Sequence, residues 1–437
     1  MNKKTTVGIA TLGCKVNQYE SEAIAEAFER RGCIIAPFNT PCDVYIINTC
    51  TVTAESDRKA RQMIRRARQQ NGAAFVLVTG CFSQSAPAAV AAIEGVDFVC
   101  GNTNKLAVVE AAMGLLAGGE KPQKPTLAVG DVESAPFEPM CITHFERTRA
   151  YVKIEDGCEN RCTYCAIPAA RGRVRSKPLP EVVAEVEGLL RGGCREVVLT
   201  GIETASWGRD LEGVTLMDLL EAVDKIADGA RIRLGSLDPS LMREEFVERL
   251  AALKHLAPHF HLSIQSGSSK VLAAMKRKYN RDMALAGIAR LRRALPHVEL
   301  TADFIVGFPG ESEADFADTV DFAKAADFLA MHVFAYSRRE GTLAAKMKGQ
   351  IDTATKKVRS AALIALGDTL RHGRLTAALQ APLQDVLFES FENGLATGHT
   401  ATFLEVVVPS PVPLHGEVLP VRLLEVREGQ IFGEIAR

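Results

Sequence analysis

The chain has 437 residues, of which 47% are hydrophobic and 24% charged, with 52 Lys+Arg against 53 Asp+Glu. This length suggests two to four domains, and the composition excludes a disordered chain, a collagen-like repeat and a protein that holds nucleic acid by bulk charge alone. The 11 cysteines are an odd number and too sparse for a disulfide scaffold. We therefore interpret them as candidate ligands or nucleophiles in a reducing compartment.

The sequence indicates no export or membrane segment. Residues Met1 to Cys14 carry two lysines but only a short apolar run, which predicts a β-strand rather than a signal peptide. Nowhere do 18 apolar residues follow one another, as a membrane-spanning helix would require. We expect a cytoplasmic protein with no membrane partner.

Short apolar runs alternate with helical patterns over the first 110 or so residues. The runs are Val7–Leu12, Val44–Ile47, Phe75–Val78 and Val96–Val99. This βαβα patterning predicts a parallel sheet covered by helices.

Cysteines follow these runs within turns. Cys14, Cys50 and Cys81 come after the first three runs, and Cys100 follows the fourth. Because ligands of open α/β sheets bind beyond the carboxyl ends of the strands, we expect the first three thiols to converge at one edge, with Cys100 as a candidate fourth member. Buried apolar cysteines are the alternative.

Further along the chain, clustered Gly and Pro between residues 112 and 145 predict a linker or covering loop. A second βα series then starts at Tyr151, with strands expected near residues 151–155, 196–200, 231–235, 260–265, 301–306 and 331–336. Six units make a barrel two units short of a TIM barrel. After about Ala377, short β runs with turn signals predict a small all-β barrel.

The expected fold class is therefore α/β with three domains. The predicted division is residues 1–112 for the N-terminal parallel-sheet domain, 113–143 for the linker, 144–375 for the partial (β/α)6 barrel and 376–437 for the C-terminal β-barrel.

The most specific motif is Cys158-Glu159-Asn160-Arg161-Cys162-Thr163-Tyr164-Cys165, directly after the first strand of the expected barrel. Three thiolates on one compact loop suit three corners of an iron–sulfur cubane and leave the fourth iron open. A structural zinc would require a fourth ligand at similar range. A zinc knuckle or reactive thiols are the alternatives.

This CxxxCxxC motif, with an aromatic residue before its last cysteine and a six-unit barrel behind it, resembles the radical S-adenosylmethionine (SAM) family. The resemblance implies that the open iron chelates the amino and carboxylate groups of SAM, and that electron transfer cleaves SAM to methionine and a 5′-deoxyadenosyl radical. Candidate SAM-binding residues follow the expected strands, where the catalytic face of a barrel lies. They are Glu203, Gln265, Ser266, Gly307, Gly310 and Arg338. Structural turns are the alternative for most of them, and a solvated ion pair for Arg338.

The segments around Cys14, Cys50 and Cys81 resemble the methylthiotransferases, a radical-SAM group whose N-terminal domain holds a second three-cysteine 4Fe-4S cluster. The C-terminal β-barrel resembles that group's TRAM domain, including Gly398-His399-Thr400. The resemblance implies two 4Fe-4S clusters, two equivalents of SAM per turnover, an electron donor such as flavodoxin or ferredoxin, and a sulfur source.

The segment Gly13-Cys14-Lys15-Val16-Asn17-Gln18-Tyr19-Glu20 is most similar to the branch that modifies threonylcarbamoyladenosine in tRNA. That branch installs a methylthio group at C2 of the adenosine beside the anticodon, position 37 of the tRNA. The alternatives within the family are isopentenyladenosine in tRNA and an aspartate of a ribosomal protein. An iron–sulfur RNA-binding or electron-carrier protein without catalysis is the alternative from another class, against which the Gly307–Glu311 turn argues.

Basic stretches make RNA a plausible partner. The helix expected after Cys50 and the segment after Cys165 supply phosphate-contacting candidates. These are Arg58, Arg61, Arg65, Arg68, Arg171, Arg173 and Arg175. A third stretch is Lys276, Arg277, Lys278 and Arg281; a solvated helix face is the alternative for each stretch. Residues 376–437, in contrast, contain three basic and eight acidic residues. We therefore expect tRNA affinity to rest mainly on the first two domains.

Overall fold

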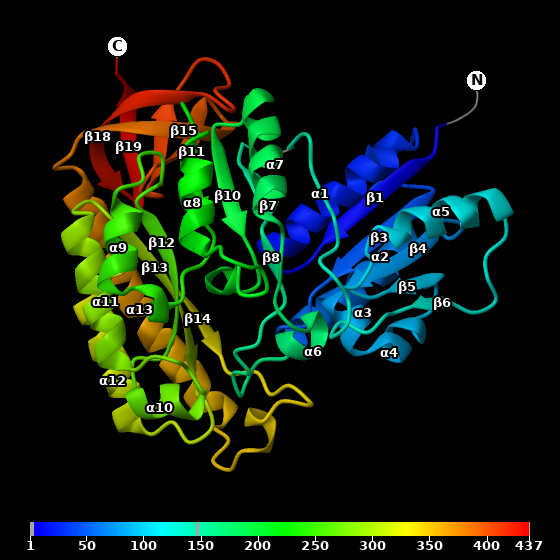
Figure 1. The fold of residues 1–437 in the computed structure, drawn as a ribbon, viewed down its shortest axis with the longest axis horizontal. Helices are drawn as coiled ribbons and strands as arrows, with labels where there is room; N and C mark the ends of the chain where they lie inside the picture. The colour runs from blue at the N-terminus through cyan, green and yellow to red at the C-terminus, as the bar shows by residue number, and fades with distance from the viewer. Residues whose placement is uncertain (1–3, 146–147, 437) are drawn as a thin grey trace.

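The computed structural model describes residues 4–145 and 148–436. Figure 1 shows three bodies in chain order: the N-terminal domain in blue and cyan, a central partial barrel in green to orange, and a small β-barrel in red. No helix of the described residues is long and apolar enough to cross a membrane.

The N-terminal domain is a six-stranded, fully parallel sheet in the order β2-β1-β3-β4-β5-β6. Its strands are β1 Thr6–Thr11, β2 Ile34–Ala36, β3 Val44–Thr49, β4 Phe75–Gly80, β5 Phe98–Cys100 and β6 Thr126–Ala128, and its helices are α1 Lys15–Arg30, α2 Ala54–Gln70, α3 Cys81–Ser85, α4 Pro87–Ala91 and α5 Ala107–Gly118. Strands β3 and β4 are buried throughout. Helices therefore cover both faces of the sheet, as an apolar parallel sheet requires.

Two apolar clusters show this covering. Ile64 of α2 packs on one face with Val76 and Val78, and Phe28 of α1 packs on the other with Leu77. The alternation within β4 follows from the two-residue period of a strand. The short edge strands β2 and β6 were not expected, because three residues carry no periodic signal. Helix α5 extends past residue 112, and β6 lies inside the expected linker.

The central domain contains six parallel strands in two sheets, β11-β10-β7 and β12-β13-β14. Isolated bridges pair Ile232 with Leu256 and Leu237 with Leu262, so the two sheets form one curved wall. The strands are β7 Ala150–Lys153, β10 Glu196–Thr200, β11 Arg231–Leu234, β12 His259–Gln265, β13 Glu299–Val306 and β14 Ala330–Ala335. This confirms the predicted partial (β/α)6 barrel.

Helices and short elements complete the central domain. The helices are α6 Ile167–Arg171, α7 Leu179–Arg191, α8 Leu216–Asp224, α9 Glu244–Ala251, α10 Ser269–Ala274, α11 Arg281–Ala294, α12 Glu313–Ala326 and α13 Thr353–Ala378; the 3₁₀ turns are η1 Thr204–Ser206, η2 Pro239–Leu241 and η3 Ala344–Lys346; and the hairpin strands are β8 Glu155–Asp156 and β9 Arg175–Ser176. Helix α13 crosses residue 375, where the C-terminal domain was expected to begin.

The C-terminal residues form a closed five-stranded barrel in the order β15-β16-β17-β19-β18. Its strands are β15 Leu383–Glu392, β16 Leu395–Thr400, β17 Glu405–Pro409, β18 Val418–Arg427 and β19 Gln430–Ile435. Val386, Phe388 and Val406 fill its core together with Leu375 of α13. The small all-β barrel is thus confirmed; its identity as a TRAM domain stays a prediction.

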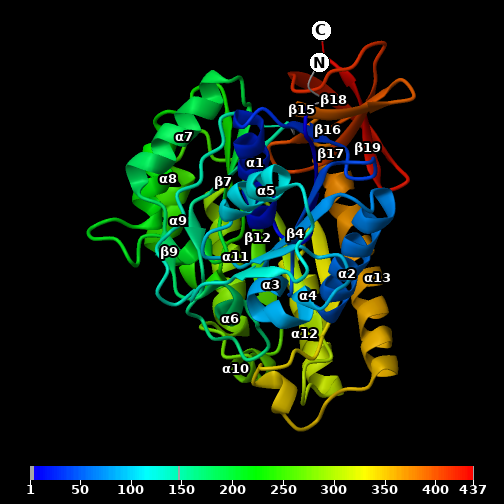
Figure 2. The same ribbon diagram turned by 90° about the vertical axis from the view of Figure 1, so that its right-hand side faces the viewer.

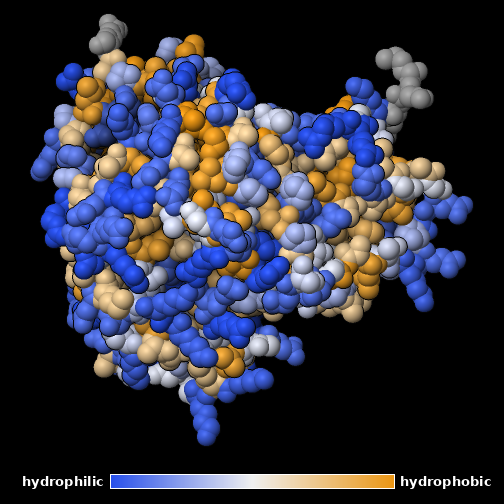
Figure 3. Space-filling view, viewed as in Figure 1, coloured by the Kyte–Doolittle hydropathy of each residue, from blue (hydrophilic) through white to orange (hydrophobic). Residues whose placement is uncertain are grey.

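The N-terminal domain lies against the central domain along α1, which Figure 2 shows in front of the barrel strands. Tyr19 of α1 packs into the barrel core, and its hydroxyl donates to the Met140 carbonyl at 2.7 Å and lies 3.0 Å from Glu185 Oε1. The α1 helix therefore belongs to two cores at once. Figure 3 shows hydrophilic residues over much of the exposed face, with small apolar patches between them.

Candidate active site

The Cys158–Cys165 loop leaves β8 at Gly157, where the backbone enforces a glycine. Gly157 has φ +85°, and a Cβ there would lie 1.8 Å from the Arg173 carbonyl oxygen. The Cys158 amide donates to the Gly172 carbonyl at 3.0 Å, and the Cys165 amide donates to the Cys162 carbonyl at 3.1 Å. The loop is therefore folded on itself, with its three cysteines on one short turn.

The three thiols of this loop are half-buried and have donors beside them. Arg277 Nη1 lies 3.3 Å from Cys162 Sγ, and the Ile167 amide donates to Cys165 Sγ at 3.4 Å. Burial raises the pKa of Cys158 to about 12 and that of Cys165 to about 11. Such thiols become thiolates when a metal neutralises them. The donor set fits a three-cysteine 4Fe-4S cluster with one open iron.

Glu203 is fixed to the cysteine loop from the end of β10. Its carboxylate accepts a hydrogen bond from Asn160 Nδ2 at 2.6 Å, and its backbone amide donates to Glu155 Oε2 at 2.8 Å. Burial, with the nearby charge of Asp238, raises the pKa of Glu203 to about 7. The structure therefore places Glu203 beside the loop.

Gln265 and Ser266 end β12 at the same edge. Gln265 has φ +62°, a left-handed conformation that a non-glycine residue adopts at some energetic cost. The buried Ser266 hydroxyl lies 3.3 Å from Thr319 Oγ1 and accepts from the Ser268 amide. Ser266 thus holds the turn, while strain at Gln265 marks the strand end.

The turn after β13 contains two glycines in the left-handed region, Gly307 at φ +71° and Gly310 at φ +82°. The Gly307 amide donates to Glu311 Oε1 at 2.9 Å, and Arg359 Nη1 holds the same oxygen at 2.6 Å. Arg338 lies exposed in the loop after β14. All six candidate SAM-binding residues therefore lie at or just beyond the carboxyl ends of barrel strands.

The second set of thiols comes together at the carboxyl edge of the N-terminal sheet. A Cβ on Gly13 would lie 2.9 Å from Cys50 Sγ, so the Cys14 turn touches Cys50. Burial, with the nearby Cys81 and Cys14 thiols, raises the pKa of Cys50 to about 11. Cys14 keeps accessible surface, although surrounding protein raises the pKa of its thiol. This combination fits a side chain that lines a recess. The three thiols therefore lie near one another at this edge, and their role as cluster ligands stays a prediction.

Arg171 connects the segments that carry the two sets of thiols. It ends α6, which follows Cys165, and its Nε lies 3.3 Å from Cys81 Sγ. Its other nitrogens hold Glu20 Oε1 at 2.6 Å, Asn17 Oδ1 at 2.6 Å and Asp156 Oδ2 at 3.1 Å. Arg171 is 0% exposed. A buried guanidinium, with each of its nitrogens hydrogen-bonded, thus bridges the N-terminal and central domains.

A wider buried network surrounds Arg171. Lys105 pairs with Glu20, and Lys153 Nζ lies 2.9 Å from Glu20 and 3.2 Å from Asp156. Arg175 Nη2 donates to the Arg171 carbonyl at 2.7 Å. The expectation that Arg171 and Arg175 contact RNA is therefore corrected: both are buried, and their charges act within the protein. Arg277, from the third basic stretch, is likewise turned inward, with Nη2 2.6 Å from Asp238 Oδ2.

The remaining basic candidates do lie at the surface. Along α2, Arg58 and Arg65 are exposed and Arg61 and Arg68 half-buried, and Arg173 is exposed beyond α6. Arg58 is paired with Glu55 at 2.5 Å. Two neighbouring surface hollows are lined by arginines of α2. Arg61 also lies over the ring of Phe82, which follows Cys81. The basic face of α2 therefore adjoins the N-terminal thiols.

Several residues at this site could not be recognised from the sequence. Arg339, rather than Arg338, reaches the N-terminal domain: its Nη2 lies 2.6 Å from Thr51 Oγ1 and 2.8 Å from Asp57 Oδ2. Asn17 and Glu20 were visible only as parts of a motif. One sequence feature did point to a buried charge network: the acidic pair Glu155-Asp156 lies between an apolar strand and the cysteine loop, where buried carboxylates need cationic partners. Cys100 donates to the Asn104 carbonyl at 3.0 Å, which supports a packing role.

The site defines a class of protein, and comparisons with known proteins agree with it. Residues 152–323 match the family model of the Radical SAM superfamily, and residues 6–101 match that of the uncharacterized protein family UPF0004. The radical SAM methyltransferase TsrM of Kitasatospora setae has a similar fold, with a TM-score of 0.57, 18% identity and coverage of 78% of this chain and 77% of that one. The chain is a radical SAM protein, a class that uses a 4Fe-4S cluster and SAM.

Curated relatives narrow the class. The threonylcarbamoyladenosine tRNA methylthiotransferase MtaB of Bacillus subtilis is 39% identical over 96% of this chain and 94% of its own length. MtaB of Thermotoga maritima is 38% identical over 81% and 80%. The tRNA-2-methylthio-N(6)-dimethylallyladenosine synthase of Moorella thermoacetica is 33% identical over 99% and 98%. The chain belongs to the radical SAM tRNA methylthiotransferases.

Proposed function

We propose that this enzyme installs a methylthio group at C2 of N6-threonylcarbamoyladenosine at position 37 of tRNA. Five MtaB relatives, at 32–39% identity, support this substrate over isopentenyladenosine. The observation that carries the proposal is the contact between the elements that hold the two sets of thiols. Helix α3, which begins at Cys81, packs on α6, which follows Cys165, and Arg171 of α6 reaches Cys81 Sγ.

The C2–H bond of adenine is unactivated, so a positioned acid or base does not remove this hydrogen, whereas a carbon radical does. We propose that Cys158, Cys162 and Cys165 hold one 4Fe-4S cluster and that Cys14, Cys50 and Cys81 hold a second. When bound, the first cluster with one SAM supplies the radical, and the second supplies sulfur that receives methyl from another SAM.

Side chains and backbone of this chain bind SAM and position the two sets of thiols in the proposed mechanism. Glu203, bound to Asn160 of the cysteine loop, and the strained Gln265 line the carboxyl edge where we propose that SAM binds. Gly307 and Gly310 leave that edge without side chains, so the backbone can approach an adenine or ribose closely. The Arg171 network holds the two thiol sets at a constant separation. Arg338 is exposed and is proposed to meet the SAM carboxylate.

For tRNA, we propose the basic face of α2 and Arg173 as phosphate contacts. These residues lie next to Phe82 and Cys81, so a bound anticodon arm would place its base near both sets of thiols. A flavodoxin- or ferredoxin-type carrier as electron donor, a separate sulfur source and a cytoplasmic location complete the proposal, since the tRNA substrate is there.

Mass spectrometry of tRNA nucleosides from cells with and without this gene tests the proposed function. We expect the 2-methylthio form of threonylcarbamoyladenosine to disappear on deletion and to return on complementation. Loss of the 2-methylthio form of isopentenyladenosine instead would assign the enzyme to the other tRNA branch. Unchanged tRNA together with loss of a methylthio-aspartate would contradict a tRNA substrate.

A further inference from the structure

A cavity of about 350 Å³ lies inside the barrel, and no cysteine is among the residues that line it. Its walls come from three parts of the molecule: Lys15 from α1, His259, His261 and His332 from β12 and β14, and Phe403 from the C-terminal domain. This volume suits a small ligand or part of a larger one. The Cys-ligated site does not account for these polar walls.

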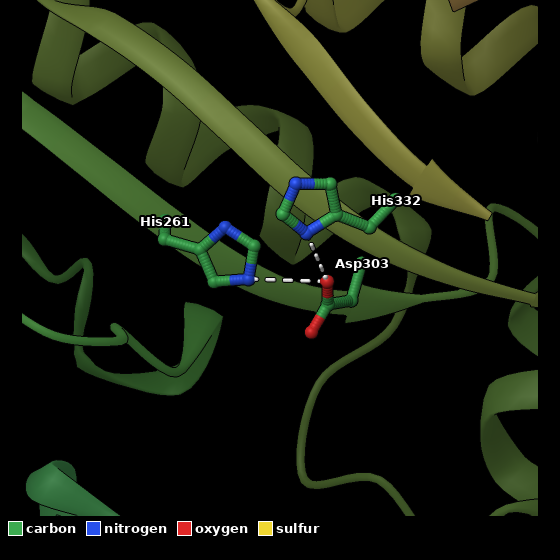
Figure 4. A group of neighbouring side chains, drawn as sticks. All are labelled: His261, Asp303 and His332. Carbon is green, nitrogen blue, oxygen red and sulfur yellow. Dashed lines mark ion pairs between the residues drawn. The ribbon is translucent and has the colours of Figure 1, made fainter. Parts of the chain in front are cut away.

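Two histidines in this cavity converge on one carboxylate, as Figure 4 shows. His261 Nε2 and His332 Nδ1 each lie 3.2 Å from the same oxygen of Asp303. Thr301 Oγ1 lies 2.9 Å from His261 Nδ1 and orients that ring. Asp303 therefore fixes two imidazoles in the cavity wall, and its hydrogen bond to His332 raises the pKa of that imidazole.

The cationic side chains in the cavity wall differ in whether a carboxylate of the protein is paired with them. Arg149 Nε lies 2.8 Å and Arg233 Nε 2.6 Å from Glu196 Oε1, so two guanidinium groups share one carboxylate and the wall keeps a net positive charge there. The Lys15 side chain makes no hydrogen bond or ion pair within the described part of the chain. Two buried nitrogens, Arg233 Nη1 and His259 Nδ1, are also without a hydrogen-bond partner there. Buried polar atoms of this kind call for a polar ligand.

The cavity has a definite position relative to the thiols. Lys15 follows Cys14 directly. On the barrel side, His261 lies four residues before Gln265, and Asp303 lies four residues before Gly307. At about 3.3 Å per residue, the imidazoles lie on the order of 13 Å inside the barrel from the SAM-binding edge. An adenine that presents C2 at that edge would therefore direct its N6 substituent toward the cavity.

We propose that this cavity binds the threonylcarbamoyl group of the substrate, with Lys15 paired to its carboxylate and His332 donating a hydrogen bond to it. This inference rests on the proposed function and adds the residues that select the substrate. The carboxylate lies seven covalent bonds from C2, about 8 Å in an extended chain. That reach covers about two thirds of the estimated distance of about 13 Å from the SAM-binding edge to the imidazoles.

Selectivity follows from the chemistry of the wall. An isopentenyl group has no charge and no hydrogen-bonding atom, so it would offer no partner to the Lys15 ammonium or to His332 Nε2, the ring nitrogen that does not face Asp303. Sites built to pair with a polar group reject analogues that lack it, because the buried partners stay unsatisfied. The cavity would therefore distinguish an anionic N6 substituent from an apolar one.

A divalent metal is the competing occupant, because two histidines and one carboxylate with ligand atoms within 4.8 Å can hold one. The charge around the triad argues against it: Lys15 and Arg233 line the same cavity and repel a second cation. An anion is attracted by those same groups. The observations thus favour the carboxylate.

The test is binding of an anticodon stem-loop carrying threonylcarbamoyladenosine, compared with the same stem-loop carrying the neutral carboxamide of that group. Dissociation constants are measured by fluorescence anisotropy on the cluster-loaded enzyme. Wild-type protein should bind the acid about 10- to 100-fold more tightly than the amide. Lys15→Met should bring this ratio close to one without weakening binding of the amide, and Lys15→Arg should keep most of it. Lys225→Met, an exposed lysine at the end of α8, is the matched control.

Two outcomes would overturn the inference. In the first, Lys15→Met weakens acid and amide equally, which would make Lys15 a general phosphate contact. In the second, the cluster-free protein binds one equivalent of Zn²⁺ or Mn²⁺ that His332→Ala abolishes, which would make the triad a metal site. Either outcome leaves the proposed function intact if methylthiolated threonylcarbamoyladenosine still forms. Failure of the proposed function is seen separately, as absence of that nucleoside with the wild-type enzyme.

Discussion

At the scale of single residues, we expect one set of cysteines to be needed for radical formation and the other for sulfur insertion. Cys158→Ala should abolish reductive cleavage of SAM, because the cysteine loop then lacks one of three cluster ligands. Cys50→Ala should leave cleavage in place and stop sulfur insertion. 5′-Deoxyadenosine and the modified nucleoside, measured by mass spectrometry on anaerobically reconstituted protein, check both. Cys33→Ala is the control, since Cys33 is buried in the N-terminal core beside Met113. Loss of SAM cleavage in Cys50→Ala would contradict the division.

Substitution of Arg171 should lower the stability of the protein. Arg171→Met removes the cation shared by Glu20 and Asp156 and leaves buried carboxylates with fewer partners. Breaking a buried pair in this way costs about 3–5 kcal/mol. Chemical denaturation should show this as a lower midpoint, whereas Arg173→Met, an exposed arginine two residues away, should change it little. Equal effects of the two substitutions would mean that the bridge contributes no more than surface charge.

At the scale of elements, α2 is the helix whose charge should matter for tRNA. Arg65→Glu together with Arg66→Glu reverses two exposed arginines without touching the buried stripe of Ala60, Ile64 and Ala67. We expect weaker tRNA binding and a shallower slope of log K against log salt, by about one for each phosphate that the helix no longer neutralises. Arg191→Glu, on the exposed end of α7, is the matched control. An unchanged salt dependence would remove α2 from the RNA interface.

Elements with strong periodic patterns were predictable, and weak ones were not. The six barrel strands were expected within a few residues of where they lie, since each is an apolar run between helical patterns. Strand β6 and the end of α13 were not, because their positions depend on neighbours: β6 exists by pairing with β5, and Leu375 of α13 packs into the C-terminal barrel. Local patterns carry no information about such partners.

Across the whole molecule, the positions of the thiols could be predicted from local patterns, whereas the charged residues around them could not. The cysteines could be predicted because spacing and strand ends place them along the chain. Arg171 could not, because a basic residue in a basic stretch is normally solvated, and only the docking of α1 onto the barrel buries it with Glu20. The cavity at Lys15 likewise requires three domains in contact. Sites built at interfaces between domains depend on tertiary structure that no local pattern encodes.

This interface should be sensitive to acid. Although burial alone would raise them, Arg171 and its lysine neighbours hold the pKa of Glu20 well below 4.5 and that of Asp156 below 3.8. For a carboxylate whose pKa is lowered on folding, the stabilisation is full above the unfolded-state pKa and is lost as pH falls through the folded-state value. Docking of the N-terminal domain should therefore be constant from pH 7 to about pH 5 and weaken below about pH 4.5.

Small-angle X-ray scattering of cluster-free protein measures this docking without interference from acid-induced breakdown of the clusters. We expect the radius of gyration to increase below about pH 4.5 while helix content, followed by circular dichroism, stays high. Glu20→Gln should weaken docking at pH 7 and flatten its dependence on acid, because Glu20 no longer takes up a proton. Glu248→Gln, on the exposed side of α9, is the control. A radius that stays constant down to about pH 3 would show that apolar contacts such as Tyr19 hold the domains together without the charge network.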